Sequence, residues 1–348
     1  MTAYPATLLE EQIRLVFESW GLEAEQTDAC CRGMLYADLR GIDTHGIAML
    51  PSYAALARDK KLKPQAKPKI TASFGAIALL DADHGFGHPA SEMAMHWAVK
   101  AAKTTGIAAV SVRNSNHFGA AGYYAHLAAE QGMAGFAMSG TPGRTVVPPL
   151  SRDPRFGALP FAFAAPSKAG APMVVDVAIS TVAMGKINLA RLAGKPIPEG
   201  WAVDLEGRPL TDAAEAFKLK RLTPMAGHKG YGLGVMVETL ASLASVSNVG
   251  GADLKTGKRG DTLDIGHFFV AFNPDALEAC QLGEACDDFA DYLHSATPID
   301  PANPVLVPGD PERQTMTRRL EEGIPLLPRL VDEIRTVAEE SGARFVLT

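Results

Sequence analysis

The middle of the chain alternates short apolar runs with helical patterns, and this alternation most restricts what the chain can fold into. The runs are four to six residues long and are bounded by Gly, Pro, Asn or Asp, which is typical of buried strands. They are 77–81, 107–112, 135–139, 161–165 and 173–176. Helical spacing of apolar residues predicts helices over 90–104, 120–131 and 231–243. This order favours an α/β (α+β) fold around a central sheet.

The chain is predicted to be helical at both ends. Thr7 and Glu10 have the spacing of a capping box, and an amphipathic helix follows as far as Gly21. A second helix is predicted over 23–39, and a last helix ends at Gly342. The polar, Gly-rich stretches 195–226 and 247–262 are predicted to be surface loops.

The segment 60–69 is rich in Pro and Lys and is the best candidate for a linker. We therefore expect a helical N-terminal segment, 1–69, that packs with C-terminal helices in 300–348. Between them we expect a mixed α/β core, 70–299.

Charge and hydropathy exclude several functions. The 348 residues include 33 Lys and Arg against 39 Asp and Glu, with no basic run, so we expect no nucleic-acid partner. No apolar stretch reaches the ~18 residues of a membrane span, so we expect no membrane association. Acidic residues follow the initiating Met closely, unlike a signal peptide, which predicts a cytoplasmic protein. The four cysteines, 30, 31, 280 and 286, have no zinc or disulfide spacing and are expected to be reduced thiols.

A glycine-rich turn, 85–90, resembles half of a dinucleotide-binding fingerprint. It reads Gly-Phe-Gly-His-Pro-Ala and lies between a predicted strand and a predicted helix. The fingerprint also needs an acidic residue about 20 positions later, but no Asp or Glu lies between Glu92 and Glu130. Pro89 removes a backbone N–H where a pyrophosphate would bind. This segment is therefore not expected to be a Rossmann fingerprint.

Three of the nine histidines lie in segments suited to chemistry. His45 lies between Thr44 and Gly46 in a loop, His117 follows a predicted buried strand, and His228 precedes Lys229 and alternating glycines. Histidine is the commonest general acid or base, and a strand end is a frequent place for α/β ligand sites. His117 could instead be a capping or buried polar residue. The glycines at 230–234 could simply allow tight helix packing.

Metal and serine-hydrolase chemistry are less favoured. Asp81, Asp83, His84 and His88 are close in sequence, but they match no recognised ligand spacing, so we expect no metal site. The chain contains no Gly-x-Ser-x-Gly nucleophile motif.

Several segments in the same order resemble the type-2 malate/L-lactate dehydrogenase family, which includes ureidoglycolate, sulfolactate and diketogulonate oxidoreductases and piperideine-2-carboxylate reductases. The longest are Asp-Leu-Arg-Gly-Ile-Asp-Thr-His-Gly (38–46), Val-Arg-Asn-Ser-Asn-His-Phe-Gly-Ala-Ala-Gly-Tyr (112–123) and Ile-Pro-Glu-Gly-Trp-Ala-Val-Asp (197–204). Shorter matching segments are 176–180, 185–187, 229–233 and 307–310. The resemblance covers nearly the whole chain.

The resemblance implies an oxidoreductase that uses NAD or NADP, a non-Rossmann nucleotide fold with a mixed sheet, a small carboxylate substrate and a homodimer. It implies acid/base catalysis by His117, with His45 in the same pocket and Asp176 at a cofactor-binding strand end. The cofactor positions it implies are Thr141, Asp176, Val177, Ala178, His228, Lys229, Gly230, Pro308, Gly309 and Asp310. On chemical grounds, Asp176 could orient either catalytic histidine, and Lys229 could offset phosphate charge.

The chain departs from the family pattern in the substrate pocket. Met49 stands where several members have an arginine that can clamp a second carboxylate, so we expect a smaller or more apolar substrate than malate or ureidoglycolate. Tyr53 is retained and could hydrogen-bond a carboxylate. Arg259, in a Gly-rich loop, is a possible replacement clamp. The segment 157–160 reads Gly-Ala-Leu-Pro where Gly-Thr-Asn-Pro is common, so two polar groups are absent.

We predict an enzyme that interconverts a small 2-oxo acid and its 2-hydroxy acid. An alternative within the same fold is reduction of a cyclic 2-imino acid such as piperideine-2-carboxylate, since one proton donor could serve both. Two further alternatives are a catalytically silent ligand-binding protein and a metal-dependent hydrolase.

Overall fold

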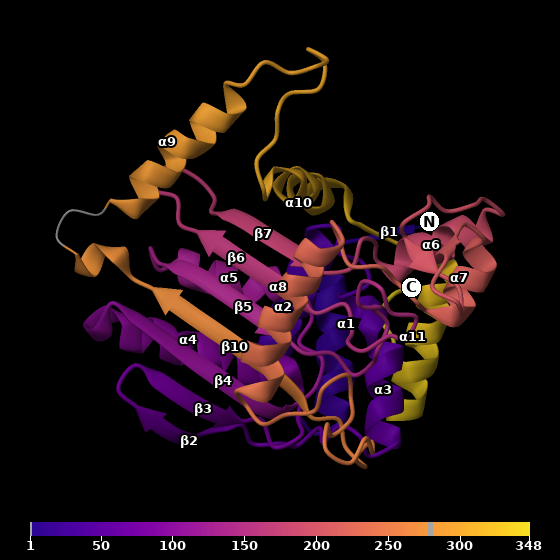
Figure 1. Cartoon of the computed structure of the whole chain (residues 1–348). Helices are drawn as coiled ribbons and strands as arrows, with labels where there is room; N and C mark the ends of the chain where they lie inside the picture. The colour runs from indigo at the N-terminus through magenta and orange to yellow at the C-terminus, as the bar shows by residue number, and fades with distance from the viewer. Residues whose placement is uncertain (1, 278–280) are drawn as a thin grey trace.

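A seven-stranded mixed sheet forms the centre of the computed structural model, which describes residues 2–277 and 281–348 (Figure 1). Its strand order is β2-β3-β4-β10-β5-β6-β7. The strands are β2 (Lys69–Phe74), β3 (Ile77–Asp81), β4 (Ile107–Ser115), β5 (Ala134–Ser139), β6 (Pro160–Ala165), β7 (Met173–Ala178) and β10 (Ile265–Phe272). In this sheet β3 and β4 run parallel and the other neighbouring pairs are antiparallel. The predicted mixed sheet is confirmed, and it differs from the parallel sheet of a Rossmann fold.

The five predicted strands all form, but β2 and β10 were not predicted. β2 starts at the end of the proposed linker and is mostly exposed, so it carries little apolar signal. In β10, Gly266 and His267 interrupt the apolar run. β10 nevertheless occupies the middle of the sheet, where it pairs with both β4 and β5.

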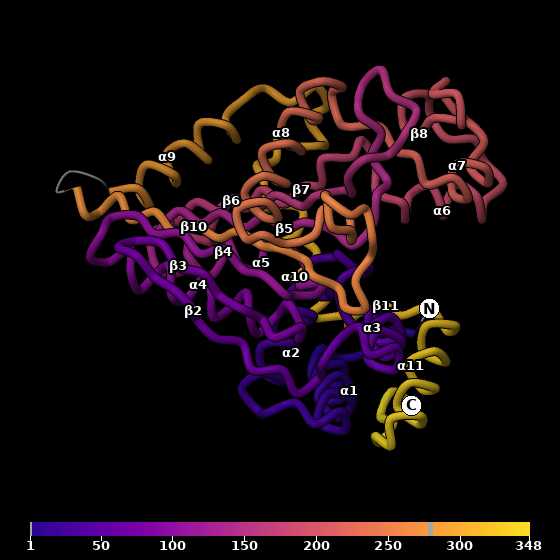
Figure 2. The backbone as a smooth tube through the Cα atoms, turned by 60° about the horizontal axis from the view of Figure 1, so that its bottom comes forward, coloured from indigo at the N-terminus to yellow at the C-terminus, as the bar shows by residue number. Residues whose placement is uncertain are grey.

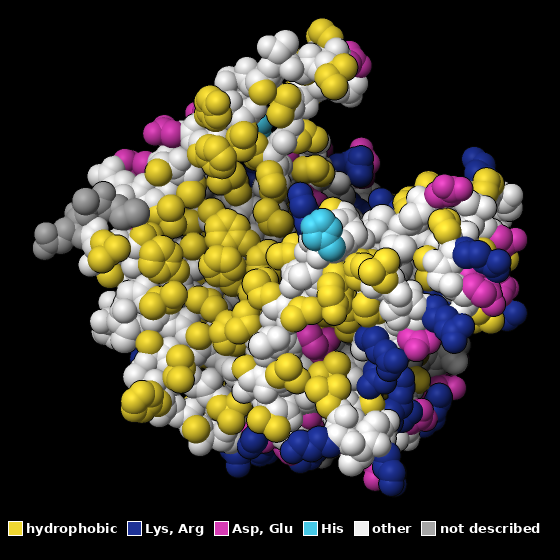
Figure 3. Space-filling model, in the orientation of Figure 1, with side chains coloured by type: hydrophobic (Ala, Val, Ile, Leu, Met, Phe, Trp, Pro, Cys, Tyr) yellow, Lys and Arg dark blue, Asp and Glu magenta, His cyan; other side chains and the backbone are white. Residues whose placement is uncertain are grey.

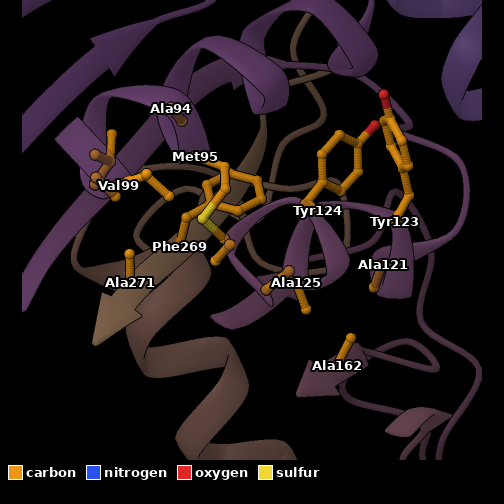
Figure 4. Close-up of a cluster of buried hydrophobic side chains, with 14 of the residues drawn as sticks. Ala94, Met95, Val99, Ala121, Tyr123, Tyr124, Ala125, Ala162, Phe269 and Ala271 are labelled. Atoms are coloured by element: carbon orange, nitrogen blue, oxygen red, sulfur yellow. The ribbon is translucent and has the colours of Figure 1, made fainter. Parts of the chain in front are cut away.

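One face of the sheet is covered by α4 (Gly87–Thr105) and α5 (Ala121–Ala129), which enclose the main core. In α4, Ala90, Ala94, Ala98 and Ala102 recur every four residues and are fully buried. These small side chains let the helix approach the strands closely. Figure 4 shows the larger side chains, among them Met95, Tyr124 and Phe269, that fill the space between the layers.

The two ends of the chain form a common unit beside the sheet (Figure 2). β1 (Thr2–Tyr4) pairs antiparallel with β11 (Ile324–Leu326). The helices are α1 (Ala6–Ser19), α2 (Ala24–Leu39), α3 (Leu50–Arg58), α10 (Asp310–Glu322) and α11 (Pro328–Ser341), with a 3₁₀ turn over Ile47–Met49. α11 packs against α1 and α3, and α10 packs against α2. The proposed boundaries, 1–69, 70–299 and 300–348, stay predictions.

The predicted terminal helices form, but the predicted capping box does not. The first helix begins after Pro5, and no side chain caps it by a hydrogen bond. Thr7 lies inside its first turn because β1, which precedes it, ends at Tyr4. At the other end Gly342 follows α11 with φ of 71°, the left-handed conformation that glycine adopts readily.

A smaller lobe has its own core and lies at the end of the sheet that carries β7 (Figures 1 and 2). It contains α6 (Met184–Leu192), β8 (Ala202–Val203), β9 (Pro209–Leu210) and α7 (Ala213–Leu219). The prediction of loops over 195–226 was therefore wrong, because elements of two to seven residues are too short to show a period. In 247–262 no helix or strand is assigned, as predicted. α8 (His228–Glu238) continues into a π-helical turn, Thr239–Leu243.

The second face of the sheet is apolar and only partly covered, since the π-helical turn after α8 packs on β4, β5 and β10 and the core of the smaller lobe takes in Phe161 and Phe268. The half-buried side chains on it include Phe136, Phe161, Phe163, Phe268 and Val270. Figure 3 shows hydrophobic side chains spread across this face of the molecule. α9 (Leu282–His294) lies at its edge with no residue buried, and it was not predicted.

Because Ile334 is fully buried between the two ends of the chain, we expect Ile334→Ala to lower the free energy of unfolding by about 2–5 kcal/mol. Urea unfolding followed by circular dichroism measures this change. The exposed Glu340 on the same helix gives the control, Glu340→Ala, which should change stability by no more than about 0.5 kcal/mol. Equal effects of both changes would contradict a shared terminal core.

Candidate active site

His117 lies just after the end of β4, on a loop held by buried polar contacts. The Asn116 side-chain amide donates to the backbone carbonyl oxygens of His84 (2.9 Å) and Gly85 (3.0 Å). The Gly87 N–H donates to the His117 carbonyl (3.2 Å), and a Cβ at Gly87 would lie 2.4 Å from the Asn116 carbonyl oxygen. The glycine-rich turn therefore serves close packing against the histidine loop.

A second layer of polar groups supports the same loop from within the sheet. The buried His267 on β10 is hydrogen-bonded through Nδ1 to Ser139 Oγ and through Nε2 to Ser115 Oγ, both at 2.8 Å. Its ring stacks on Phe118, with centroids 4.7 Å apart. β4, β5 and β10 thus jointly fix the segment that carries His117.

His45 comes from a different part of the fold and lies beside His117, with ring centroids 5.3 Å apart. It is on the loop between α2 and the 3₁₀ turn. The buried Asp38 carboxyl accepts a hydrogen bond from the Ile47 N–H (2.8 Å). A Cβ at Gly46 would lie 1.9 Å from Asp38 Oδ1, so a larger residue has no room there.

The C-terminal segment anchors this loop through Arg319 on α10. Its guanidinium donates to the Asp38 carbonyl oxygen and pairs with the Asp43 carboxylate. The Arg319 side chain is 9% exposed but that of Asp43 is 60% exposed, so a buried guanidinium binds a carboxylate at the surface and thereby orders the chain around His45.

Both histidines are held in the neutral form by their surroundings. Burial lowers the pKa of His45. Burial, followed by the nearby His45, His88 and His267, lowers the pKa of His117 well below its usual value. At neutral pH each ring can therefore accept a proton, as a general base must.

A cleft of about 340 Å³ opens beside His45. It is lined from the terminal unit by Tyr36, Arg40, Thr44 and His45, and from the sheet and following loops by Gly119, Asp176, Val177 and Ala178. Gly309 and Arg313 complete it from the start of α10. Of the predicted cofactor positions, Asp176, Val177, Ala178 and Gly309 therefore share this cleft with His45.

Asp176 does not contact a histidine in the way that we expected. Its Oδ2 accepts a hydrogen bond from the Gly122 N–H at the start of α5 (2.7 Å). A Cβ at Gly122 would lie 2.9 Å from that oxygen, so the helix backbone comes close to the carboxylate. The carboxylate faces the cleft, but surrounding protein reduces its hydration and raises the pKa of Asp176 to about 6.

Pro308 and Asp310 hold the cleft wall together. The Pro308 carbonyl accepts from the Val174 N–H (3.2 Å). The Asp310 carboxylate accepts from the Val307 N–H (2.8 Å), is hydrogen-bonded to His294 Nε2 (2.7 Å), and also pairs with Arg313. Its oxygens are thus already engaged, which leaves little capacity to bind a ligand.

The remaining predicted cofactor positions lie outside the lining of this cleft. Backbone hydrogen bonds connect the end of β7 with the neighbouring segments that carry these positions. The Met225 N–H donates to the Ile179 carbonyl, and the Ile179 N–H donates to the Ala158 carbonyl (both 2.8 Å). His228 and Lys229 are exposed, and with Gly230 they begin α8. Thr141 lies against Gly157, where a Cβ would overlap its hydroxyl.

The three predicted substrate-binding residues are not brought together. Tyr53 is fully buried, Met49 packs against the terminal core, and Arg259 is exposed on the 247–262 loop. Tyr53 cannot reach a ligand in the cleft, and neither Met49 nor Arg259 lines the cleft.

Sequence reasoning missed Arg40, which lines the cleft. Its guanidinium lies 3.7 Å from the centre of the Tyr36 ring, and it makes no ion pair within the described residues. Burial lowers the pKa of Arg40, yet the guanidinium stays charged at any physiological pH. Arg40 lies within the motif at 38–46, at the end of α2, where an arginine is ordinarily a surface charge.

Two expectations concern metal and membranes. Within residues 2–277 and 281–348, no three His, Cys, Asp or Glu side chains are arranged to hold a metal ion. Asp81 instead binds Arg113 and Asn114, and Asp83 binds Lys63. In the same part of the chain, no helix has the length and apolar character needed to cross a membrane.

The chain is similar to known enzymes over nearly its whole length. A family model described as Malate/L-lactate dehydrogenase matches residues 4–335. A malate dehydrogenase of Pyrococcus abyssi is 34% identical, covering 94% of this chain and 92% of that protein. A (2R)-3-sulfolactate dehydrogenase (NADP(+)) of Chromohalobacter salexigens is 32% identical, covering 92% and 93%.

The solved structure of a malate dehydrogenase from Entamoeba histolytica superposes with a TM-score of 0.92 at 27% identity, covering 99% of each chain. Fold, site and matches together define a class of enzyme, the dehydrogenases that act on the CH–OH group of hydroxy acids. The chain belongs to the malate/L-lactate dehydrogenase family.

Membership implies a small carboxylate substrate and a nicotinamide cofactor. The cleft has features that fit such a nucleotide. Arg40 supplies an unpaired positive charge, Val177 and Ala178 supply apolar wall, and Gly309 exposes backbone without a Cβ.

Because burial raises the pKa of Asp38 to about 7, above its value in an unfolded chain, the protonated carboxyl stabilises the fold. This stabilisation is complete below about pH 4 and is lost as the pH rises through 7. We expect Asp38→Asn to remove this loss while keeping an acceptor for the Ile47 N–H. Urea unfolding at a series of pH values measures it. Asp332→Asn, at an exposed site, should leave the wild-type pH dependence unchanged, and the same result for Asp38→Asn would refute the expectation.

Proposed function

We propose that this protein interconverts a small monocarboxylic 2-oxo acid and its 2-hydroxy acid, with NADH or NADPH as the hydride carrier. The observation that carries the proposal is the pair of neutral histidines, His45 and His117, beside a cleft that holds the unpaired Arg40. A proton-transfer group and a cation for an anionic ligand thus lie at one site.

In this proposal His117 is the general acid/base. When the hydroxy acid is oxidised, its hydroxyl proton passes to a ring nitrogen of His117 as the hydride leaves the adjacent carbon. Reduction returns the proton to the carbonyl oxygen. The bound nicotinamide supplies only the hydride acceptor or donor. His45 lines the cleft next to this ring and would orient the substrate oxygen.

Arg40 would bind an anionic group of the substrate or of the nucleotide. A guanidinium matches a carboxylate or a phosphate with paired hydrogen bonds. Lys229, exposed at the start of α8, would offset phosphate charge, and Asp176 would bind the nucleotide at the end of β7. Since Met49 offers no charge and Arg259 lies away from the cleft, a second carboxylate would lack a partner there.

We also propose that two copies associate through the open face of the sheet. Phe136 and Phe163 are half-buried on the uncovered part of that face, near the helix α9, which has no buried residue. Monomeric proteins rarely leave a continuous apolar surface of this kind in water, and pairing of identical faces is the commonest way to cover one.

We propose that the protein works in the cytoplasm. The thiols of Cys30 and Cys31 are buried and free, which is compatible with a reducing compartment. Cys280 lies outside the described residues.

The function is tested by mixing the protein with NADH or NADPH and a candidate substrate and following the loss of the absorbance of the reduced nucleotide. The candidate substrates are pyruvate, longer 2-oxo acids, 2-oxo diacids and piperideine-2-carboxylate. We expect monocarboxylic 2-oxo acids to be reduced fastest. His117→Gln should lower kcat by about 10²- to 10⁴-fold. His96→Gln, at an exposed site outside the cleft, is the control.

Each other outcome assigns a different function. Turnover of the cyclic imine alone would make the protein an imino-acid reductase. Nucleotide binding without turnover of any compound would favour a silent binding protein. Activity that needs no nucleotide and is lost with EDTA would indicate a metal-dependent hydrolase.

Light scattering during size-exclusion chromatography tests the dimer, which should have twice the mass of the 36.8 kDa chain. Phe163→Glu places a charge on the open face and should give a folded monomer. Leu327→Glu, exposed on the terminal unit, should leave the dimer intact. A monomeric wild-type protein at micromolar concentration would disprove this part of the proposal.

A further inference from the structure

Tyr53 lies behind the catalytic histidine, away from the cleft. The side chain is fully buried in the terminal core, where Phe86 and His88 contact its ring edge to face at centroid distances of 5.4 and 5.9 Å. Its hydroxyl is 2.9 Å from Nδ1 of His117. A group so enclosed cannot bind a substrate carboxylate, so its hydrogen-bonding capacity is directed to the histidine.

Two groups face Nδ1 of His117, and they differ in what they can do. The Gly119 N–H, at 3.3 Å, can only donate, so it favours a bare Nδ1 and a proton on Nε2. A neutral ring in that form has no lone pair on Nε2 with which to accept a substrate proton. The Tyr53 hydroxyl is closer and can either donate or accept. It is thus compatible with both forms of the ring, and when Nδ1 carries the proton, Tyr53 is the group that can accept the hydrogen bond from it.

We propose that Tyr53 is a positioning residue for proton transfer, which accepts a hydrogen bond from Nδ1–H of His117 and leaves Nε2 free for the substrate. The inference rests on the proposed function of His117 as the acid/base. In oxidation, the substrate O–H bond breaks and its proton joins Nε2, giving a ring with both nitrogens protonated. In reduction, the Nε2 proton passes to the substrate oxygen. Nδ1–H stays bonded to Tyr53 in both directions, so Tyr53 itself gives up no proton.

The other ionisable groups around His117 increase the importance of this acceptor. His45 faces it from the loop after α2, His88 from α4 and His267 from β10. All three lower the pKa of His117, after the larger effect of burial. No carboxylate hydrogen-bonds to the ring within the described residues, so Tyr53 is the acceptor at Nδ1 that can stabilise the protonated form.

Tyr53→Phe tests the inference, because it removes the acceptor and keeps the ring in place. We expect kcat to fall about 10- to 100-fold in both directions, as for loss of a hydrogen bond to a charged group. The KM of the carboxylate substrate should change less than about 3-fold, because Tyr53 does not reach the cleft. The pKa of His117 should fall further, so the acid limb of the oxidation rate should move to lower pH.

Tyr4→Phe is the matched control, since Tyr4 is another buried tyrosine of the terminal core and lies on β1. It should leave kcat, KM and the pH profile at wild-type values. A merely structural role of Tyr53 would lower activity without moving the pH profile. Titration with NADH, followed by its fluorescence, checks that the variant still binds nucleotide.

Other results would overturn the inference. A raised KM at unchanged kcat would make Tyr53 a substrate ligand, and wild-type kinetics would remove its role. If wild type is active and His117→Gln is equally active, the acid/base assignment itself fails, and the role of Tyr53 fails with it. Should Tyr53→Phe not fold, nitrogen NMR of histidine-labelled wild type decides. A bare Nδ1 with a protonated Nε2 on His117 in the nucleotide complex would refute the inference, and the reverse pattern would support it.

Discussion

The side-chain amide of Asn116 connects the parts of this molecule that must meet at its centre. Both of its hydrogen bonds go to backbone carbonyls of the turn that precedes α4, so the end of β4 and the start of α4 are held together. The same turn approaches the backbone of His117, and glycine at 87 is what permits that approach. A buried amide with both donors satisfied is rigid because breaking either bond leaves a polar group without water. The loop that carries His117 is therefore held rigidly as well.

The cleft lies where the central sheet and the terminal unit meet. The sheet side contributes Gly119 and the end of β7, and the terminal unit contributes His45 and Arg40, whereas His117 lies outside this lining and beside His45. Neither unit alone has both histidines. Arg319, which reaches from α10 to the loop at Asp43, fixes that loop, which carries His45, within the terminal unit.

Periodicity and turn chemistry predicted five strands of the central sheet and the helices α1, α2, α4, α5, α8 and α11, because each of these shows a recognisable apolar pattern, but they did not predict β2, β10 or α9. The motif at 112–123 and the loop at His45 likewise indicated where chemistry lies. What the sequence could not reveal are contacts between distant segments. Tyr53 lies 64 positions before His117, and in the sequence its hydroxyl cannot be told from a ligand-binding group. Arg40 is similar, since an arginine at a helix end is ordinarily a surface charge. Element lengths also limited prediction, because β8 and β9 have two residues each.

The pairing of β1 with β11 brings together segments that are made at opposite ends of synthesis. Because a ribosome releases the N-terminal part of a chain first, α1 and α2 emerge long before α10 and α11. During that time the apolar faces of α1 and α2 lack the helices against which they later pack. The His45 loop likewise lacks Arg319 during that time. A nascent or truncated chain can therefore build the sheet and His117, yet it has no complete cleft. The cleft around His45 therefore depends on contacts that form only after α10 has been made.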